Sequence, residues 1–412
     1  MLPASVLGDE GTRLFQSHAH RVNCMSEILH SLESNGDSVY LAGRGGELNL
    51  RALEIDFRAD PRWRPFVAAH PNGTAYHHPL WLEALEKEYG QRIVTLACES
   101  GDGQLRALLP LIYTKGLPFR IGGQSAARRL SSLPRTPIGG PLSIDRLASA
   151  VVLRAAIKLV RQDPGTRLQL KTHEVGLDEL ADSLACTFWR HTYVLDLPNR
   201  PEDLRFGNPR NRNRIRWAVN KAAKHGVRVR PAETADDLKA WYEIYLDTMR
   251  RNVVPPRPYR FFEALWGPMR SGGLMQLLLA EQVWEKGKRL LAGSIFLMFG
   301  RTVCYAFNGA QPEDFSLRPN DAIQWHAIHD ACKAGFRLFD FGEVPEGNTH
   351  LAEFKSKWGA EPKQLLRYHH PPLKMSDGEE SEGYSQRLTR VVWQRLPLKA
   401  TAWMSDWLYR FL

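Results

Sequence analysis

Apolar residues recur along the chain with helical and strand periods, and the order of these periods predicts the fold. Leu82, Leu85 and Tyr89 lie three and four positions apart, which predicts a helix that Gly90 would end. Two apolar runs flank the turn at 100–103 and predict a hairpin. The elements expected in the first half are a helix over 79–89, strands over 93–99 and 105–113, a helix over 145–161, and strands over 167–173 and 193–197.

The second half of the chain repeats this order. Its expected elements are a helix over 235–249, strands over 274–281, 290–299 and 303–308, a helix over 321–334, and strands over 336–341 and 364–369. Apolar hairpins can look alike by chance, but a repeated order of elements favours duplication of one unit. We therefore expect an α/β protein with mixed sheets and two tandem domains.

The length of the chain also indicates two domains, because 412 residues exceed what one hydrophobic core usually supports. The first fifty residues are polar and rich in glycine, with a weak helical pattern at 23–32. The expected division is an N-terminal extension over 1–50, a first domain over 51–200, a second domain over 201–370 and a basic aromatic tail over 371–412.

The composition is that of a globular protein, with 43% apolar and 24% charged residues. The longest apolar stretch, 290–300, is about half of the ~20 residues that a membrane-spanning helix needs. The N-terminus lacks the pattern of a secretory signal, and the five cysteines are scattered, as is common for reduced thiols. We therefore expect a cytoplasmic protein with neither a disulfide framework nor a metal site.

Two segments carry much of the net charge of +10, which predicts attraction to polyanions. The segment 204–225 has a cationic face that includes Arg214 and Lys221; this face is either only solvated or a contact for phosphates of RNA or a nucleotide. In the tail, Trp403 and Trp407 lie four residues apart among basic residues. The tail is expected either to pack on a domain or to rest on an anionic membrane surface.

Candidate catalytic residues follow the strand predicted over 336–341. Asp340 lies near the tip of this strand, Glu343 follows it, and Lys355 comes twelve residues later. Acyl transfer to an amine needs a base for the proton of the nucleophile and a cation or hydrogen-bond donor for the developing oxyanion. Asp340 or Glu343 could be the base and Lys355 the cation. Alternatively, Asp340 only caps a helix or loop, and Lys355 is only an exposed lysine without a role in catalysis.

Several short segments together resemble the FemAB-type transferases and the related BioF2-like acetyltransferase domains, across roughly residues 55–370. The segments are 212–226, Phe-Asp-Phe-Gly at 339–342, Phe-Lys-x-Lys-Trp-Gly-Ala-Glu-Pro at 354–362, Asn-Gly-Ala at 308–310, Pro-Asn at 319–320, and His-Pro-x-Trp at 78–81. The resemblance implies two tandem GNAT-like domains, which agrees with the duplication.

The resemblance also implies an activity: direct transfer of an acyl or aminoacyl group to an amine or hydroxyl of a cell-envelope precursor, either peptidoglycan or exopolysaccharide. By resemblance, Phe354 and Lys355 hold the reacting substrate and its negative charge, and Asp340 acts near the nucleophile. The remaining residues expected to bind substrate are Trp358, Asn308, Asn320, Glu343, Arg214 and Lys221. The acceptor would be a small molecule or a glycan linked to a lipid or nucleotide.

The donor stays open between acyl-CoA and aminoacyl-tRNA, and no tightly bound cofactor is expected. Acetyltransferases that use coenzyme A usually hold the pyrophosphate in a glycine-rich loop before a helix, whereas the corresponding segment here, 312–320, contains no glycine. Two further hypotheses are an acyl-CoA-dependent N-acyltransferase outside the cell envelope and a non-catalytic polyanion-binding protein. Peripheral contact of the tail with the inner face of the membrane is also an expectation.

Overall fold

The computed structural model describes residues 38–43, 46–116, 128–285, 287–373, 392–409 and 411. The helical pattern predicted at 23–32 lies outside the described residues. So does the acidic part of the tail.

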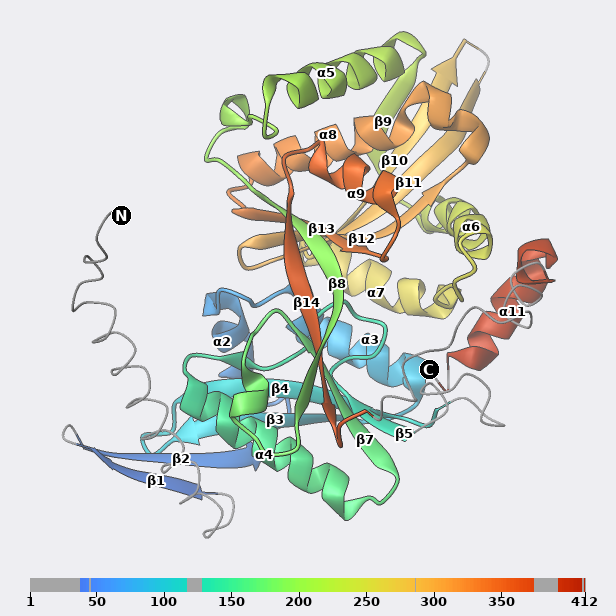
Figure 1. The fold of residues 1–412 in the computed structure, drawn as a ribbon. Helices are drawn as coiled ribbons and strands as arrows, with labels where there is room; N and C mark the ends of the chain where they lie inside the picture. Colours follow the sequence, from blue (N-terminus) through green and yellow to red (C-terminus); the bar gives the residue numbers. More distant parts are fainter. Residues whose placement is uncertain are drawn as a thin grey trace, which may run out of the picture.

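The described strands form one mixed sheet that runs through the whole molecule (Figure 1). In spatial order the strands are β1 (Ser38–Gly43), β2 (Gly46–Glu54), β3 (Ile93–Ser100), β4 (Leu105–Thr114), β5 (Arg128–Ser131), β7 (Thr166–Thr172), β14 (Glu361–His370), β8 (Ala185–Asp196), β13 (Leu338–Val344), β12 (Thr302–Ala310), β11 (Gly287–Phe299), β10 (Met275–Trp284) and β9 (Val227–Pro231). The short β6 (Leu142–Ser143) pairs with β4.

The two ends of this sheet are built alike, which confirms the predicted duplication. On each side three successive antiparallel pairs lead to one parallel pair, β5 with β7 in the first half and β12 with β13 in the second. In the first half, β1 adds a further antiparallel pair with β2 at the edge of the sheet. The last strand of each half then lies beside the other half, because β14 pairs with β7 and β8 pairs with β13. Because the last strand of each half lies beside the other half, the domain boundary between residues 200 and 201 stays a prediction.

Helices cover both faces of the sheet (Figure 1). They are α2 (Trp63–Ala69), α3 (Pro79–Tyr89), α4 (Arg146–Gln162), α5 (Pro209–Lys224), α6 (Ala235–Arg251), α7 (Tyr259–Ser271), α8 (Pro319–Lys333), α9 (Thr349–Ser356) and α11 (Leu398–Leu408), with short three-ten turns η1 (Ala75–His77), η4 (Leu177–Glu179), η5 (Pro201–Asp203) and η6 (Pro312–Leu317). The helix predicted over 79–89 is confirmed as α3, and Gly90 ends it with a φ of 62°.

The sequence pattern did not predict helices α2, α7 and α9, strands β1, β2, β5, β6 and β9, or the first part of β8. Helix α7 follows a proline-rich segment and contains Pro268, which lacks the N–H of a helix interior, so its pattern does not indicate a helix. Helix α9 has only eight residues. Strand β8 begins eight residues before the predicted start at Tyr193, because its first part is half-buried on both faces and shows no apolar alternation.

Helices α3, α6 and α7 share one hydrophobic core with residues from both halves of the sheet. The buried Trp81 ring of α3 meets Phe261 of α7 edge-on, with 5.2 Å between the ring centroids. Gly309 of β12 allows α6 to lie directly on the sheet, since a Cβ there would come within 2.7 Å of the Tyr245 backbone nitrogen. The halves are therefore packed together as well as paired through strands.

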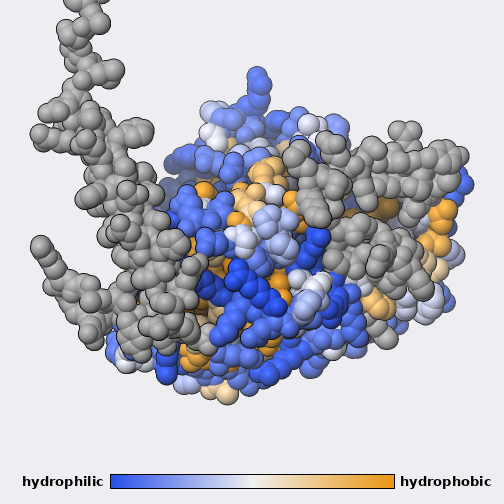
Figure 2. All heavy atoms as spheres, turned by 60° about the horizontal axis from the view of Figure 1, so that its bottom comes forward, coloured by the Kyte–Doolittle hydropathy of each residue, from blue (hydrophilic) through white to orange (hydrophobic). Residues whose placement is uncertain are grey.

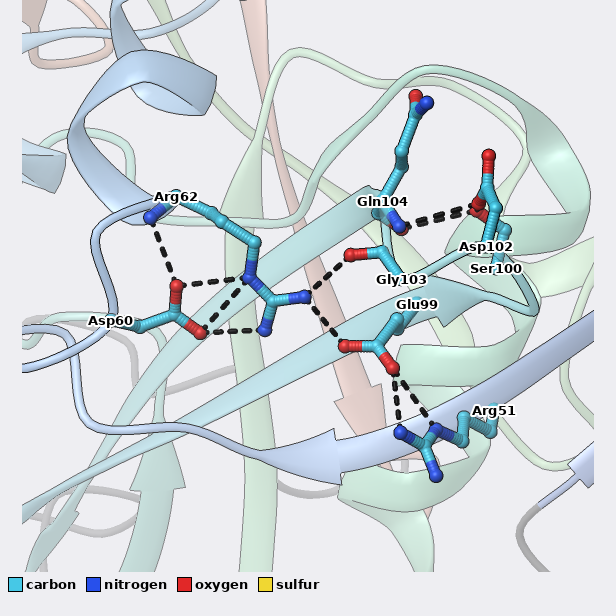
Figure 3. A network of polar contacts seen from close by, with 8 residues as sticks. All are labelled: Arg51, Asp60, Arg62, Glu99, Ser100, Asp102, Gly103 and Gln104. Carbon is cyan, nitrogen blue, oxygen red and sulfur yellow. Dashed lines mark hydrogen bonds and ion pairs between the residues drawn. The ribbon is translucent and has the colours of Figure 1, made fainter.

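A polar network fixes the outer hairpin of the first half (Figure 3). The Arg62 guanidinium donates to Asp60 and Glu99, each at 2.6 Å, and to the Gly103 carbonyl. Arg51 from β2 donates to the other Glu99 oxygen at 2.6 Å. Hydrogen bonds from Arg62 and Arg51 lower the pKa of Glu99. The network ties the segment before α2 to the β3–β4 turn.

A buried ion pair joins the two halves away from the sheet. Glu88 of α3 accepts a hydrogen bond from Arg257, and both side chains are almost completely buried. Arg257 also donates to the Arg135 carbonyl at 2.9 Å. A buried charge that loses its partner keeps the full cost of its desolvation.

We expect the substitution Glu88→Ala to lower the free energy of unfolding by about 3 to 5 kcal/mol, because it leaves the Arg257 charge buried and unpaired. Urea denaturation followed by circular dichroism measures this change. Glu83→Ala is the control: Glu83 of the same helix contacts Arg58 at 3.5 Å at the surface, and its loss should cost less than about 1 kcal/mol. Equal losses for the two variants would contradict the prediction.

Candidate active site

The sheet opens where the parallel strands β12 and β13 separate. They pair over three positions only, the last being Cys304 with Asp340. Beyond it β12 stays with β11 and β13 stays with β8. Ala306 forms a bulge in β12 just past this point, which interrupts the regular backbone pairing. The opening therefore begins at Asp340.

Asp340 is buried at the start of the opening and is held on one side. Its Oδ1 atom accepts hydrogen bonds from Thr192 Oγ1 at 2.6 Å and from the Gly342 backbone N–H at 2.8 Å. Gly342 has a φ of 76°, a conformation that favours glycine. Among the hydrogen bonds of the described residues, none involves Oδ2. One carboxylate oxygen is thus anchored and the other is available to a ligand.

Lys355 of α9 is buried, with 3% of its surface exposed, and its ammonium group points back to β13. Its Nζ donates to the carbonyl oxygens of Gly342 at 2.8 Å and Glu343 at 3.0 Å. Burial lowers the pKa of Lys355 to about 8, and the nearby charges of Asp340 and Glu343 oppose this shift. An ammonium group has three hydrogens, so one donor remains beyond the two carbonyls.

Glu343 turns towards β8. Its Oε2 atom accepts from Trp189 Nε1 and from the Arg190 guanidinium, both at 3.2 Å. The Arg367 guanidinium of β14 lies over the Trp189 ring, 3.1 Å from its centroid. The structure thus brings Asp340, Glu343 and Lys355 together at one end of β13.

Four residues of this site were missed by the sequence analysis: Thr192, Trp189, Arg190 and Arg367. The first three lie on β8 and the fourth on β14, strands that meet β13 only through the exchange between the halves. Trp189 and Arg190 belong to the part of β8 that was not predicted. A sequence pattern holds no signal for such pairing, because the register of two distant strands is set in the folded sheet.

The aromatic residues of the 354–362 segment lie next to the catalytic candidates. Lys357, not Lys355, contacts the Phe354 ring, with Nζ 4.4 Å from its centroid. Lys357 also pairs with the buried Asp321. The Trp358 ring is fully buried and meets Phe206 edge-on at 5.7 Å.

The other candidate residues lie on β12, α8 and α5. Asn308 Oδ1 accepts from Ser294 Oγ at 3.0 Å. Asn320 is in the first turn of α8, and its buried Oδ1 has no hydrogen-bond partner among the described residues. Arg214 is exposed on α5, and Lys221 places its Nζ 5.3 Å from the Trp217 ring centroid. Helix α5 packs against α8.

Carboxylates occupy the segment where a pyrophosphate-binding loop would lie. Residues 312–317 form the three-ten turn η6, and the backbone N–H groups of Asp314 and Arg318 donate to carbonyls of this segment. The buried Asp314 pairs with Arg289 at 2.5 Å, and Asp321 lies in the first turn of α8. These two backbone N–H groups are already bonded, and the two carboxylates are paired with Arg289 and Lys357.

Cavities of different size lie around the second half. One of about 220 Å³ lies between β8 and the start of α9, with Arg190, His191 and Tyr193 on one side and residues 344–349 on the other. A larger one, about 470 Å³, lies against β9–β12 and the C-terminal end of α8 and contains none of the catalytic candidates. Among the described residues, no helix is long and apolar enough to span a bilayer. The described part also has no cluster of three or more metal-ligating side chains.

Comparison with known proteins identifies the fold. Residues 209–356 match the family model of the acetyltransferase (GNAT) domain. The structure resembles the crystal structure of FemX, with a TM-score of 0.60 at 17% identity over 77% of this chain and 96% of that one. It also resembles a conserved protein of unknown function from Bacteroides thetaiotaomicron VPI-5482, with a TM-score of 0.51 at 10% identity over 77% and 98% of the two chains.

One curated protein is similar to this chain in amino-acid sequence. The chain is 24% identical over 160 residues to the UDP-N-acetylmuramoylpentapeptide-lysine N(6)-alanyltransferase of Weissella viridescens. The match covers 39% of this chain and spans about half of that protein, 46%. The match places a GNAT domain over residues 209–356, and the whole chain has a fold like that of FemX. These comparisons support the FemAB-like resemblance that the sequence shows.

We expect Lys355 to titrate near pH 8, well below an ordinary lysine, because its ammonium group is desolvated. NMR of lysine labelled with ¹³C at Cε measures this titration, and the Lys355→Arg variant assigns the signal. Asp340→Asn should lower the pKa of Lys355 further, since it removes a negative charge that favours the ammonium form. A signal that titrates above pH 10 would contradict the described burial.

Proposed function

We propose that this protein transfers an acyl or aminoacyl group to an amine or hydroxyl of a cell-envelope precursor. The observation that carries the proposal is the buried Lys355 ammonium beside Asp340, at the point where β12 and β13 separate. The relative from Weissella viridescens is named as an alanyltransferase that acts on a lysine of UDP-N-acetylmuramoylpentapeptide. That name supports an amine acceptor on a peptidoglycan precursor, in preference to an exopolysaccharide.

In this proposal Asp340 is the base. Thr192 and Gly342 hold its Oδ1 atom, which fixes the plane of the carboxylate and directs Oδ2 to the nucleophile. A base held in one orientation takes the proton as the amine attacks the ester carbonyl of the donor. The C–O bond of the donor then breaks, and the proton held by Asp340 passes to the departing ester oxygen, which leaves as a hydroxyl. The acyl group thus passes to the amine without a covalent enzyme intermediate.

Lys355 stabilises negative charge in the same step. Its two carbonyl contacts fix the ammonium group, and the third N–H is free to donate to the oxyanion that forms on the carbonyl oxygen. Because the site is desolvated, such a charged hydrogen bond is stronger than at the surface. Phe354, Trp358, Asn308, Asn320 and Glu343 would shape the cleft around the reacting groups.

We infer that the donor is aminoacyl-tRNA rather than acyl-CoA. The segment 312–320 has no glycine, and the backbone N–H groups of Asp314 and Arg318 already donate to carbonyls, so it lacks the open amides that hold a pyrophosphate in a glycine-rich loop. Arg214 and Lys221 belong to a helix without acidic residues, a surface suited to the phosphates of an RNA. No tightly bound cofactor is part of this proposal.

The acceptor would be a glycan precursor linked to a lipid or nucleotide, met on the cytoplasmic side of the membrane. Helix α11 supports peripheral contact with that membrane, because it buries Thr401 and Ser405 and exposes Trp403 and Trp407. Exposed tryptophans beside basic residues such as Lys399 suit an anionic bilayer surface.

We expect Lys355→Ala to lower kcat by about 100-fold or more, since it removes a donor to the transition-state charge. Wild-type activity should also fall as the pH rises through about 8, because only the charged form of Lys355 can act. Lys355→Arg should retain part of the activity and lack this alkaline decline. Transfer of a radiolabelled amino acid to the muramoyl pentapeptide measures the activity of the wild type and of both variants across this pH range. The control is Lys363→Ala, at an exposed lysine of β14. Full activity of a folded Lys355→Ala variant would remove the proposed role.

The donor is tested by offering the protein aminoacyl-tRNA and acyl-CoA separately with the same acceptor. We expect transfer from aminoacyl-tRNA, abolished by prior treatment with ribonuclease, and none from acyl-CoA. Transfer from acyl-CoA alone would favour the N-acyltransferase hypothesis. Salt-sensitive RNA binding without transfer from either donor would favour a non-catalytic polyanion-binding protein.

A further inference from the structure

A small cavity lies on the outer side of the second half, between α5, α8 and the segment around η5. Its volume is about 190 Å³, and its walls include Leu204, Phe206, Arg212, Arg216, Trp325 and His329. Arg212 and Arg216 are one helical turn apart on α5, while Trp325 and His329 are one turn apart on α8. Two arginines of α5 and two aromatic rings of α8, tilted by 40° to each other, therefore line the cavity.

The aromatic wall offers a flat apolar surface and one acceptor. The Trp325 ring is partly exposed; its centroid lies 3.9 Å from that of His329 and 5.9 Å from that of Phe206. His329 Nδ1 bonds to the Trp325 carbonyl at 2.8 Å, so Nδ1 carries the hydrogen. Burial lowers the pKa of His329, which keeps the ring neutral and Nε2 an acceptor.

Further cations lie on another exposed side of α5. Arg210, Arg214 and Lys224 are exposed along α5, and the helix contains no acidic residue. The exposed Trp217 ring lies between Lys221 and Arg318, whose charged groups are 5.3 and 5.1 Å from its centroid. A ligand with several phosphates in a row fits this surface better than a single small anion.

The size and charge of the cavity decide which part of such a ligand enters it. Pockets for whole small molecules measure roughly 300 to 1,000 Å³, so 190 Å³ suits one ring system rather than a complete cofactor. Glu202 also lines the cavity and disfavours a phosphate inside it. The ring therefore belongs inside and the phosphates belong outside, on α5.

We propose that this cavity binds one unpaired base of an RNA strand whose phosphates follow the cationic face of α5. Bases released from a helix stack on aromatic rings and arginine planes and use their edges for hydrogen bonds. The proposal rests on the proposed function, since it places the RNA part of the donor. Phe206 contacts both Trp325 of the cavity and the buried Trp358, which belongs to the segment that carries Lys355.

Fluorescence anisotropy with a labelled single-stranded oligoribonucleotide and with uncharged tRNA tests the proposal. We expect Trp325→Ala to weaken binding of both by about tenfold, because it removes a stacking partner. The double variant R212A/R216A should weaken binding and reduce the slope of log K against log salt by about 1 to 1.5. R64A/R161A, at two exposed helical arginines of the first half, should change neither value, and Trp403→Ala is the matched tryptophan control.

Three results would overturn the proposal. RNA binding by the Trp325 and double-arginine variants could equal that of the wild type. The R64A/R161A control could lose as much affinity as R212A/R216A, which would indicate a diffuse effect of net charge. Adenosine monophosphate alone could bind the cavity as tightly as the oligoribonucleotide, which would make it a pocket for free nucleotides.

The transfer assay separates this inference from the proposed function. Wild-type protein that binds RNA through the cavity without transferring an amino acid would support the inference and contradict the function. Transfer from aminoacyl-tRNA with unchanged kcat/KM in the Trp325→Ala variant would support the function and contradict the inference.

Discussion

The pairing of β8 with β14 at the centre of the sheet is the contact on which the candidate site depends. The two strands run antiparallel side by side, and each then pairs with the other half, β8 with β13 and β14 with β7 (Figure 1). Through this exchange, Thr192 of β8 reaches Asp340 of β13, and Arg367 of β14 reaches Trp189. If the strands returned to their own halves, the carboxylate would lose its anchor. The site therefore belongs to the two units together.

The two units have the same plan, but their parallel strand pairs open differently. In the second half the opening between β12 and β13 holds the ammonium group of Lys355 and the free oxygen of Asp340. In the first half, residues 132–140 fill the corresponding place, where Gly140 donates its N–H to the Lys171 carbonyl at 2.8 Å. The buried Lys171 ammonium donates to carbonyls of that same segment. The place in the first half is thus filled by the chain itself, whereas the candidate site lies at the opening in the second half. On the side of the molecule that Figure 2 shows, where the first half faces the viewer, the coloured surface is mainly hydrophilic.

The burial of Lys355 connects stability with chemistry. Desolvation disfavours its charged form, while Asp340 and Glu343 favour it, so the balance leaves the pKa near 8. An unfolded lysine has a higher pKa, so between about pH 8 and pH 10 the unfolded chain binds more protons than the folded chain. The free energy of unfolding therefore rises over this range, because the cost of burying the ammonium group disappears as it loses its proton. The charge is thus retained at neutral pH against a cost in stability. A group held in this way needs no reorganisation when negative charge develops beside it.

The sequence alone predicted the main helices and strands of each half, the duplication, and Asp340, Glu343, Lys355 and Trp358 as candidate site residues, because these depend on local periodicity and on neighbours in the chain. Helix α3, for example, needs only its apolar stripe and the left-handed Gly90. Only the tertiary structure decided that Thr192, Arg190 and Arg367 belong to the site, since strand register across more than a hundred residues has no local signal. It also decided that Lys357 pairs with Asp321 and Lys355 with carbonyls of β13. The reason is physical: which of two nearby lysines is desolvated depends on the packing of α9 against the sheet, and that packing exists only in the folded chain.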